Sequence, residues 1–180
     1  PAPDKAWREV TPPVWGSEVF PNSGTILRSH FPGARETRMY VLHGKFNQHY
    51  DNDRGSLTLW GKGQPLCLDW GYVQPYSADM HNMLTSGEGV GRVAAFYASD
   101  AADYLHVDCG PWQRQVVFVK SRQPEGPNVF VVRDASTSDG TWHQWFNSAR
   151  PLAVDGDVVK MSGNGDVDLD VWVAAGRADE

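Results

Sequence analysis

Residues able to bind a metal or exchange protons are concentrated at the start of the stretch His49–Tyr72. His49, Asp51 and Asp53 occupy alternate positions there. Side chains two residues apart in an extended segment point the same way, so these three are expected to face one cleft. A histidine and carboxylates that converge from separate strands can bind zinc, manganese or calcium. The letters NDRG are also ordinary turn residues, so spacing alone leaves a plain turn as an equal alternative.

Two further residues with metal-binding side chains, Asp69 and His81, follow this group. Asp69 comes 18 residues (69 − 51) after Asp51, which is enough for a strand, a turn and a returning strand. The spacing therefore predicts a hairpin that brings the two carboxylates together. His81 lies in the segment ADMHNML, just after a proline-containing loop. For each of the six histidines, a surface or hydrogen-bonded core position remains the common alternative.

Sequence signatures of several other enzyme classes do not occur in the chain. It has no GxSxG nucleophile elbow, no P-loop and no GxGxxG dinucleotide-binding signature. Paired carboxylates of a glycoside hydrolase stay open because aspartate is abundant, although no pair is marked out as a raised-pKa acid. Among these alternatives, metal binding is the chemistry best supported by the spacing of the histidines and aspartates described above.

Composition limits both the partners and the size of the fold. The net charge is −6 and no run of Lys or Arg is present, so neither a nucleic-acid partner nor a membrane anchor is expected. The longest apolar runs are too short to span a bilayer. The 180 residues, 41% hydrophobic, favour a single domain over residues 1–180, with 1–12 as a loose arm. Cys67 and Cys109 leave a disulfide and two buried thiols as open alternatives.

The elements that must position these residues are short strands. Glycine and proline interrupt the chain throughout, and the runs between them have a period of two. In residues 166–173, Val and Leu alternate with Asp and Trp. Residues 115–120 and 128–133 are β-branched and aromatic and flank a turn-rich segment. No window of a dozen residues keeps a 3.6-residue apolar repeat, so the sequence predicts an all-β antiparallel β-sandwich with almost no helix.

Six parts of the chain follow one another in a distinctive order: FPNSGTILRS, ETRMYVLHGKF, HYDNDRGSLTLWGKGQPLCLDWGY, HNML, the pair WQRQVVFVK and NVFVVRDAS, and TWHQWFNSA. This ordered series resembles the C-terminal β-sandwich domain of the heparinase II/III-like polysaccharide lyases. The third part is similar to the signature of that family, and the fourth to its His-Asn motif. The resemblance covers most of the chain, and the order is more specific than any single motif.

The resemblance implies a lyase that cleaves uronic-acid-containing polysaccharides by β-elimination. That reaction removes the proton at C5 and expels the oxygen at C4. It needs a base, neutralisation of the carboxylate and an acid for the leaving group. The first His of the signature falls on His49, which would act as the base or as a charge-neutralising donor. Such an enzyme is expected to be secreted or periplasmic, with an acidic polysaccharide as its partner.

A structural divalent metal, usually zinc, is also implied by the resemblance. Its ligands would be Asp51, Asp69 and His81. The family usually has a histidine where this chain has Asp51, so calcium or manganese is an alternative to zinc.

Members of the family build the other wall of the cleft from an N-terminal α/α toroid that supplies a catalytic tyrosine. No part of the 180 residues is expected to form that domain, so the isolated chain is expected to be inactive. The chain is then either a piece of a larger enzyme or a stand-alone relative. The alternative function is a non-catalytic carbohydrate-binding or assembly β-sandwich. Sugar stacking would then fall to exposed aromatic side chains among Trp70, Tyr72, Trp142 and Trp145.

Overall fold

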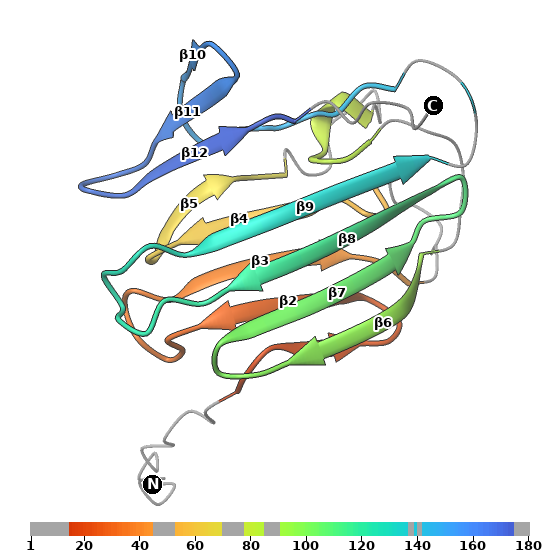
Figure 1. Ribbon diagram of the computed structural model, residues 1–180, viewed down its shortest axis with the longest axis horizontal. Coiled ribbons are helices and arrows are strands. Elements are labelled where there is room, and N and C mark those ends of the chain that lie inside the picture. Colours follow the sequence, from red (N-terminus) through yellow and green to blue (C-terminus); the bar gives the residue numbers. More distant parts are fainter. Residues whose placement is uncertain are drawn as a thin grey trace, which may run out of the picture.

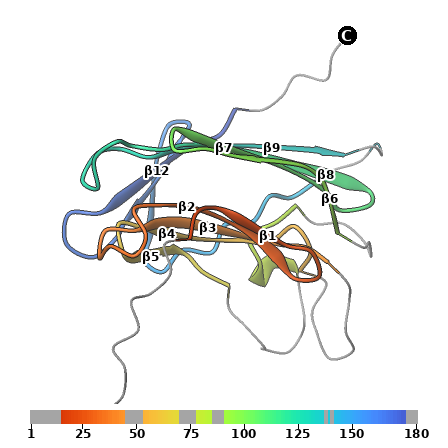
Figure 2. The same cartoon turned by 90° about the horizontal axis from the view of Figure 1, so that it is seen from below.

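The fold is a sandwich of antiparallel sheets. The computed structural model describes residues 15–44, 53–69, 78–84, 91–136, 139 and 142–174. These residues form twelve strands in three sheets and a single short 3-10 helix. Two sheets stack face to face (Figure 2), and the smaller third sheet lies beside one edge of the pair (Figure 1). The predicted all-β antiparallel β-sandwich with almost no helix is therefore confirmed for this part of the chain.

The first sheet contains five strands in chain order. They are β1 (Glu18–Phe20), β2 (Gly24–Ser29), β3 (Thr37–Leu42), β4 (Leu57–Gly61) and β5 (Gln64–Cys67). Alternate residues of β2, β3 and β4 are buried, because successive side chains of a strand point to opposite faces. The inward-facing side chains, such as those of Leu27, Val41 and Leu59, form one half of the core.

The second sheet supplies the other half of the core. Its strands, again in chain order, are β6 (Arg92–Ala98), β7 (Ala102–Asp108), β8 (Trp112–Val119) and β9 (Val129–Ser136). Strands β8 and β9 are the hairpin that the sequence predicts around residues 115–120 and 128–133. The register pairs Phe118 with Phe130, and their rings stack with 4.2 Å between centroids.

The third sheet covers the edge of the sandwich near β5 and β9. It consists of β10 (Leu152–Asp155), β11 (Val158–Ser162) and β12 (Asp168–Trp172). Met161 and Val167 from this region are buried in the main core. The 3-10 helix is η1 (Ala78–Met80). Within the described ranges no helix has the length and apolar character needed to cross a bilayer.

Cys67 and Cys109 are both free thiols, and both are buried. Of the two alternatives that the sequence leaves open, the structure therefore shows two buried thiols. Burial raises the pKa of each thiol to about 12, because desolvation disfavours the thiolate. Neither cysteine is suited to act as a nucleophile at neutral pH.

His43 is a buried titratable residue at the end of β3. Its Nε2 lies 2.8 Å from Thr25 Oγ1. Burial lowers the pKa of His43 below its ordinary value of 6.5, because the charged imidazolium loses hydration in the protein interior.

We expect His43 to make the fold sensitive to mild acid. In the unfolded chain this imidazole takes up a proton near pH 6.5, whereas in the folded chain its pKa is lower. The unfolded state therefore binds more protons as the pH falls below about 6.5, so the free energy of unfolding decreases there. Urea unfolding at a series of pH values should show a smaller acid loss for His43→Gln than for the wild type. His106→Gln, which alters a partly exposed histidine, is the matched control, and equal slopes for both variants would contradict the assignment.

Candidate metal centre

Three side chains with metal-binding groups meet at one end of the first sheet. They are Asp53, Asp69 and His81, and one ligand atom of each lies within 4.8 Å of the others. Asp53 comes shortly before β4, and Asp69 shortly after β5. Strands β4 and β5 are antiparallel neighbours, so the start of β4 and the end of β5 lie at the same end of the sheet. His81 follows η1, which brings it to that same end.

A tight turn carries Asp53 into the cluster. The backbone N–H of Ser56 donates to the carbonyl oxygen of Asp53 at 2.8 Å. Gly55 within this turn has a φ of +85°, a conformation that favours glycine. A Cβ atom at this position would also overlap the ring of Trp112. The plain turn considered for NDRG is thus present, and the same turn presents a carboxylate to the candidate centre.

Asp69 and His81 lie within hydrogen-bonding distance of each other. Asp69 Oδ2 lies 2.7 Å from His81 Nδ1. His81 is only 2% exposed, and both aspartates are partly buried. The structure therefore brings together Asp69 and His81, two of the three ligands that the resemblance implies, while their role as metal ligands stays a prediction.

The other two predicted site residues, His49 and Asp51, lie outside the described residues. The third member of the cluster within the described part of the chain is Asp53, which stands two residues after Asp51. The sequence predicts Asp53 on the same side of an extended segment as His49 and Asp51, whereas the resemblance implies Asp51 as the ligand.

The donor atoms of this cluster fit a divalent cation. Ligand atoms that lie roughly 2.0–2.6 Å from one ion are at most about 5 Å from each other, and the three groups satisfy this limit. Two carboxylates that approach each other in a partly buried site repel, and a shared cation offsets that repulsion. Two carboxylates and one imidazole are a hard donor set, so manganese and calcium compete with zinc on ligand chemistry.

Asn82 fixes the loop that carries His81. Its side chain is fully buried, and its Nδ2 donates to the carbonyl oxygen of Leu57 at 2.8 Å and to that of Leu68 at 2.9 Å. Leu57 begins β4, and Leu68 immediately precedes Asp69. One amide group therefore ties the ends of both strands to the His81 loop, so the HNML motif supplies a candidate ligand and also its anchor.

A guanidinium group from the second sheet reaches the same region. Arg114 on β8 is 0% exposed. Its Nη1 donates to the carbonyl oxygens of Gly55 and Asn82, the latter at 2.9 Å. Gly55 belongs to the turn that carries Asp53, and Asn82 directly follows His81. Arg114 is therefore a positioning residue that holds two of the three candidate ligand segments.

Asp134 on β9 neutralises Arg114. The register places the two residues opposite each other. Asp134 accepts two parallel hydrogen bonds, from Arg114 Nε at 2.8 Å and from Arg114 Nη2 at 2.7 Å. This bidentate geometry is the one that stabilises a buried arginine–carboxylate pair. The pair was not predicted from the sequence, although Arg114 is in phase with the inward-facing Trp112 and Val116 on β8, and Asp134 with Val132 on β9.

The aromatic residues considered for sugar stacking have different environments. Trp142 is partly buried and packs against the core, whereas Trp145 is exposed. Trp70 and Tyr72 lie outside the described residues. Around the candidate metal centre, Trp145 is therefore the one of these four that the described structure leaves open to a ligand.

Comparison of the chain with protein-family models and with curated proteins found no match.

Proposed function

We propose that this chain is the β-sandwich domain of a polysaccharide lyase that cleaves uronic-acid-containing polymers by β-elimination. The proposal is supported by one observation above all, the convergence of Asp53, Asp69 and His81 from three separate segments at one end of the first sheet. The ordered motifs that resemble the heparinase II/III-like lyases supply the reaction class.

In this proposal the divalent metal has a structural role. Asp53 comes four residues after His49 and two after Asp51. A cation held by Asp53, Asp69 and His81 would therefore hold one end of the short stretch that contains His49. The ion would contribute positive charge between the carboxylates. The buried contacts of Asn82 and Arg114 then keep the candidate ligands in place whether or not substrate is bound.

The chemistry itself falls to other groups. His49 would remove the C5 proton or neutralise the uronate carboxylate, and a tyrosine from a toroid domain outside this chain would protonate the leaving oxygen. On this proposal the chain forms one wall of the cleft and needs the second domain for turnover.

Removal of a ligand should abolish metal binding by the chain. The wild type is expected to retain about one equivalent of a divalent metal after dialysis, and Asp69→Asn and His81→Gln should lower metal affinity by at least about 100-fold. The reason is that each variant removes one of only three protein donor groups. Elemental analysis of the purified proteins, together with titration by zinc, manganese and calcium, measures the effect.

A matched control and a pair of variants sharpen this experiment. Asp155→Asn removes an exposed carboxylate that pairs with Lys160 and should leave metal content unchanged. Asp53→Asn should lose the metal and Asp51→Asn should keep it, whereas the opposite result would identify Asp51 as the third ligand. A wild-type chain that binds none of the three ions would refute the metal centre.

A further inference from the structure

The outer strand of the third sheet, β10, has one free edge. The strands of this sheet lie in the order β10–β11–β12, and Figure 1 shows β12 nearest the sandwich and β10 farthest from it. Within the part of the chain that the structure describes, β10 pairs with β11 alone. Alternate residues of such a strand turn their N–H and C=O groups away from the neighbouring strand. The free edge of β10 can therefore form hydrogen bonds with an additional strand.

One face of the third sheet is apolar from the core to this edge. The register places six side chains in two adjacent rows across the three strands, Leu152–Met161–Leu169 and Val154–Val159–Val171. Met161 is buried in the main core, and Leu169 and Val171 pack against that core. On β10, however, Leu152 is 45% exposed and Val154 is 73% exposed. The two rows thus begin in the core and end uncovered at the free edge, where the apolar side chains of a further strand would continue them.

Strand β10 lacks the features with which many edge strands avoid pairing with other chains. Its ladder with β11 runs through four consecutive pairs without a bulge, and Leu152–Asp155 contains neither lysine nor proline. By contrast, β5 contains Pro65, and a bulge between Val93 and Ala95 interrupts the register of β6. The addition of a strand is therefore less hindered at β10 than at these two outer strands of the larger sheets.

The opposite face of the third sheet is acidic. Successive side chains of a strand alternate between the two faces, so this face carries Asp155 on β10 and Asp168 and Asp170 on β12, all of them exposed. Between residues 152 and 172 the chain has five aspartates and one lysine, a charge of −4 (1 − 5) out of −6 for all 180 residues. The sheet therefore attracts a positively charged partner.

Pairs within the chain offset only part of this negative charge. Lys160 lies 2.8 Å from Asp155, and Arg35, from outside the third sheet, lies 3.2 Å from Asp166. Both aspartates are largely exposed, and ion pairs of exposed groups are weak. An incoming lysine or arginine can therefore compete for these carboxylates.

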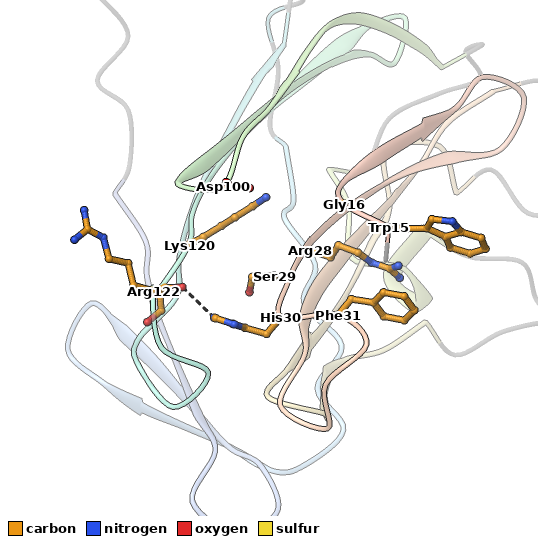
Figure 3. Close-up of a pocket in the computed structure, with 10 residues that line it drawn as sticks. Trp15, Gly16, Arg28, Ser29, His30, Phe31, Asp100, Lys120 and Arg122 are labelled. Carbon is orange, nitrogen blue, oxygen red and sulfur yellow. Dashed lines mark hydrogen bonds between the residues drawn. The ribbon is translucent and has the colours of Figure 1, made fainter. Parts of the chain in front are cut away.

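The basic residues around the cavity between the ends of β2 and β8 have counter-charges of their own. Figure 3 shows Arg28 and Lys120 among the residues that line this cavity. Glu36 lies 3.0 Å from Arg28, and Asp103 lies 2.7 Å from Lys120. The charges of these two residues are matched locally, whereas the charges of the third sheet are not.

We propose that the free edge of β10 binds an extended segment of a partner protein, in which apolar and basic residues alternate, as an additional strand. The apolar residues would continue the rows that end at Leu152 and Val154. The basic residues would lie on the acidic face, where the nearest carboxylate is that of Asp155. A second copy of β10 is a poor occupant, because it would bring another third sheet with a charge of −4 to the same edge. The ligand chemistry of this surface does not depend on the proposed metal centre or lyase reaction.

Titration of the full chain with a hexapeptide of alternating valine and lysine, blocked at both ends, tests the proposal. Fluorescence anisotropy of the labelled peptide measures affinity, and the amide chemical shifts of the chain locate the bound peptide. We expect saturable binding with the largest shift changes in β10. An analogue with glutamate in place of lysine should bind at least about tenfold more weakly.

Variants of the chain test the two faces separately. Val154→Lys puts a charge on the apolar face, and Asp155→Lys reverses the charge nearest the edge, so each should weaken binding about tenfold. The matched controls Val119→Lys and Asp100→Lys make the same two changes at exposed positions on β8 and in the β6–β7 turn. These controls should leave affinity unchanged.

N-methylation of the peptide distinguishes strand pairing from attraction between charges alone. One peptide methylated at the odd positions and another methylated at the even positions keep every side chain, but each loses the N–H groups along one edge. At least one of them should fail to bind, because main-chain hydrogen bonds hold an added strand.

Several results would overturn this proposal. They are no binding by the wild type, equal affinity for the glutamate analogue, undiminished binding of both methylated peptides, equal weakening by Val154→Lys and Val119→Lys, or shift changes confined to residues outside the third sheet. A concentration-dependent dimer that Val154→Lys abolishes would also overturn it, because the occupant would then be a second copy of the chain. Melting temperatures of the four variants check that each is folded.

Discussion

Arg114→Met should lower the free energy of unfolding by about 3–5 kcal/mol, because it breaks a buried ion pair from one side. The substitution leaves the carboxylate of Asp134 without its bidentate partner. It also removes the donor to the carbonyl oxygens of Gly55 and Asn82. Methionine fills much of the volume of arginine, so the loss reflects uncompensated polar groups more than an empty cavity. Urea unfolding followed by tryptophan fluorescence measures the change.

Two further variants distinguish the effect of losing the Arg114–Asp134 ion pair on stability from the effect of replacing any arginine by methionine. Arg133→Met changes the neighbouring arginine on β9, which is exposed, and should alter stability by no more than about 0.5 kcal/mol. The double variant Arg114→Met/Asp134→Leu removes both charges and should recover part of the loss. If Arg114→Met lowers the free energy of unfolding by less than about 1 kcal/mol, the inferred role of Arg114 in holding the two sheets together is wrong.

Arg114→Lys separates positioning from stability. Lysine keeps the charge opposite Asp134 but lacks the planar fork that reaches two carbonyl oxygens at once. We therefore expect metal affinity to fall more in this variant than its unfolding free energy alone would explain, since the segments that carry Asp53 and His81 lose a shared anchor.

His49→Ala, made in a toroid-containing parent enzyme, should lower the rate of β-elimination by about 10²–10⁴-fold. The physical reason is the loss of the proposed base, or of the group that neutralises the uronate carboxylate. The reaction creates a C4–C5 double bond, so ultraviolet absorbance follows it directly. The yield of folded protein and its metal content should barely change, because His49 is assigned to the reaction and Asp53, Asp69 and His81 to the metal.

Controls for this experiment come from the same chain. His106→Ala alters a partly exposed histidine that contacts Gln113 and should keep the parent rate. The isolated 180 residues should produce no absorbance change on any uronic polymer, because the proposed acid is supplied from outside the chain. Robust turnover by the isolated chain would refute the two-domain proposal and direct attention to Tyr50, Tyr72 or Tyr76 as an internal acid.

The strands could be predicted from the sequence because a half-buried strand has apolar residues on the face toward the core and polar residues on the other. Apolar and polar residues therefore alternate along the chain. In residues 166–173 Val and Leu alternate with Asp and Trp, and β12 lies within this run with alternating exposed and partly buried residues. The turn-rich residues 121–127 correctly predict the turn between β8 and β9. A local pattern of this kind does not say which sheets stack, so the separate third sheet and its place beside β5 and β9 could not be derived from it.

The candidate metal centre could be predicted only in part, for a related reason. Asp69 follows a recognisable strand–turn–strand spacing, which relates it to the chain just before β4. Arg114 reaches that region from the opposite sheet, and no local spacing encodes a contact between layers. An arginine in phase with buried residues was nevertheless a usable signal, because a charge on the inward face of a strand requires a partner.

The meander topology has a consequence for how the chain folds. Neighbouring strands in all three sheets are consecutive in the sequence, so each pairing requires only the closure of the loop between two successive strands. The hydrogen bond from Arg114 on β8 to Gly55, in the turn before β4, joins residues 59 positions apart and links the second sheet to one end of the first. Each sheet can therefore form without the others, whereas the contacts of Arg114 with the segments that carry Asp53 and His81 form only when the two layers dock. If the proposed centre binds a divalent ion, docking of the layers would also hold the segments that carry its ligands, and folding and metal binding would then be coupled.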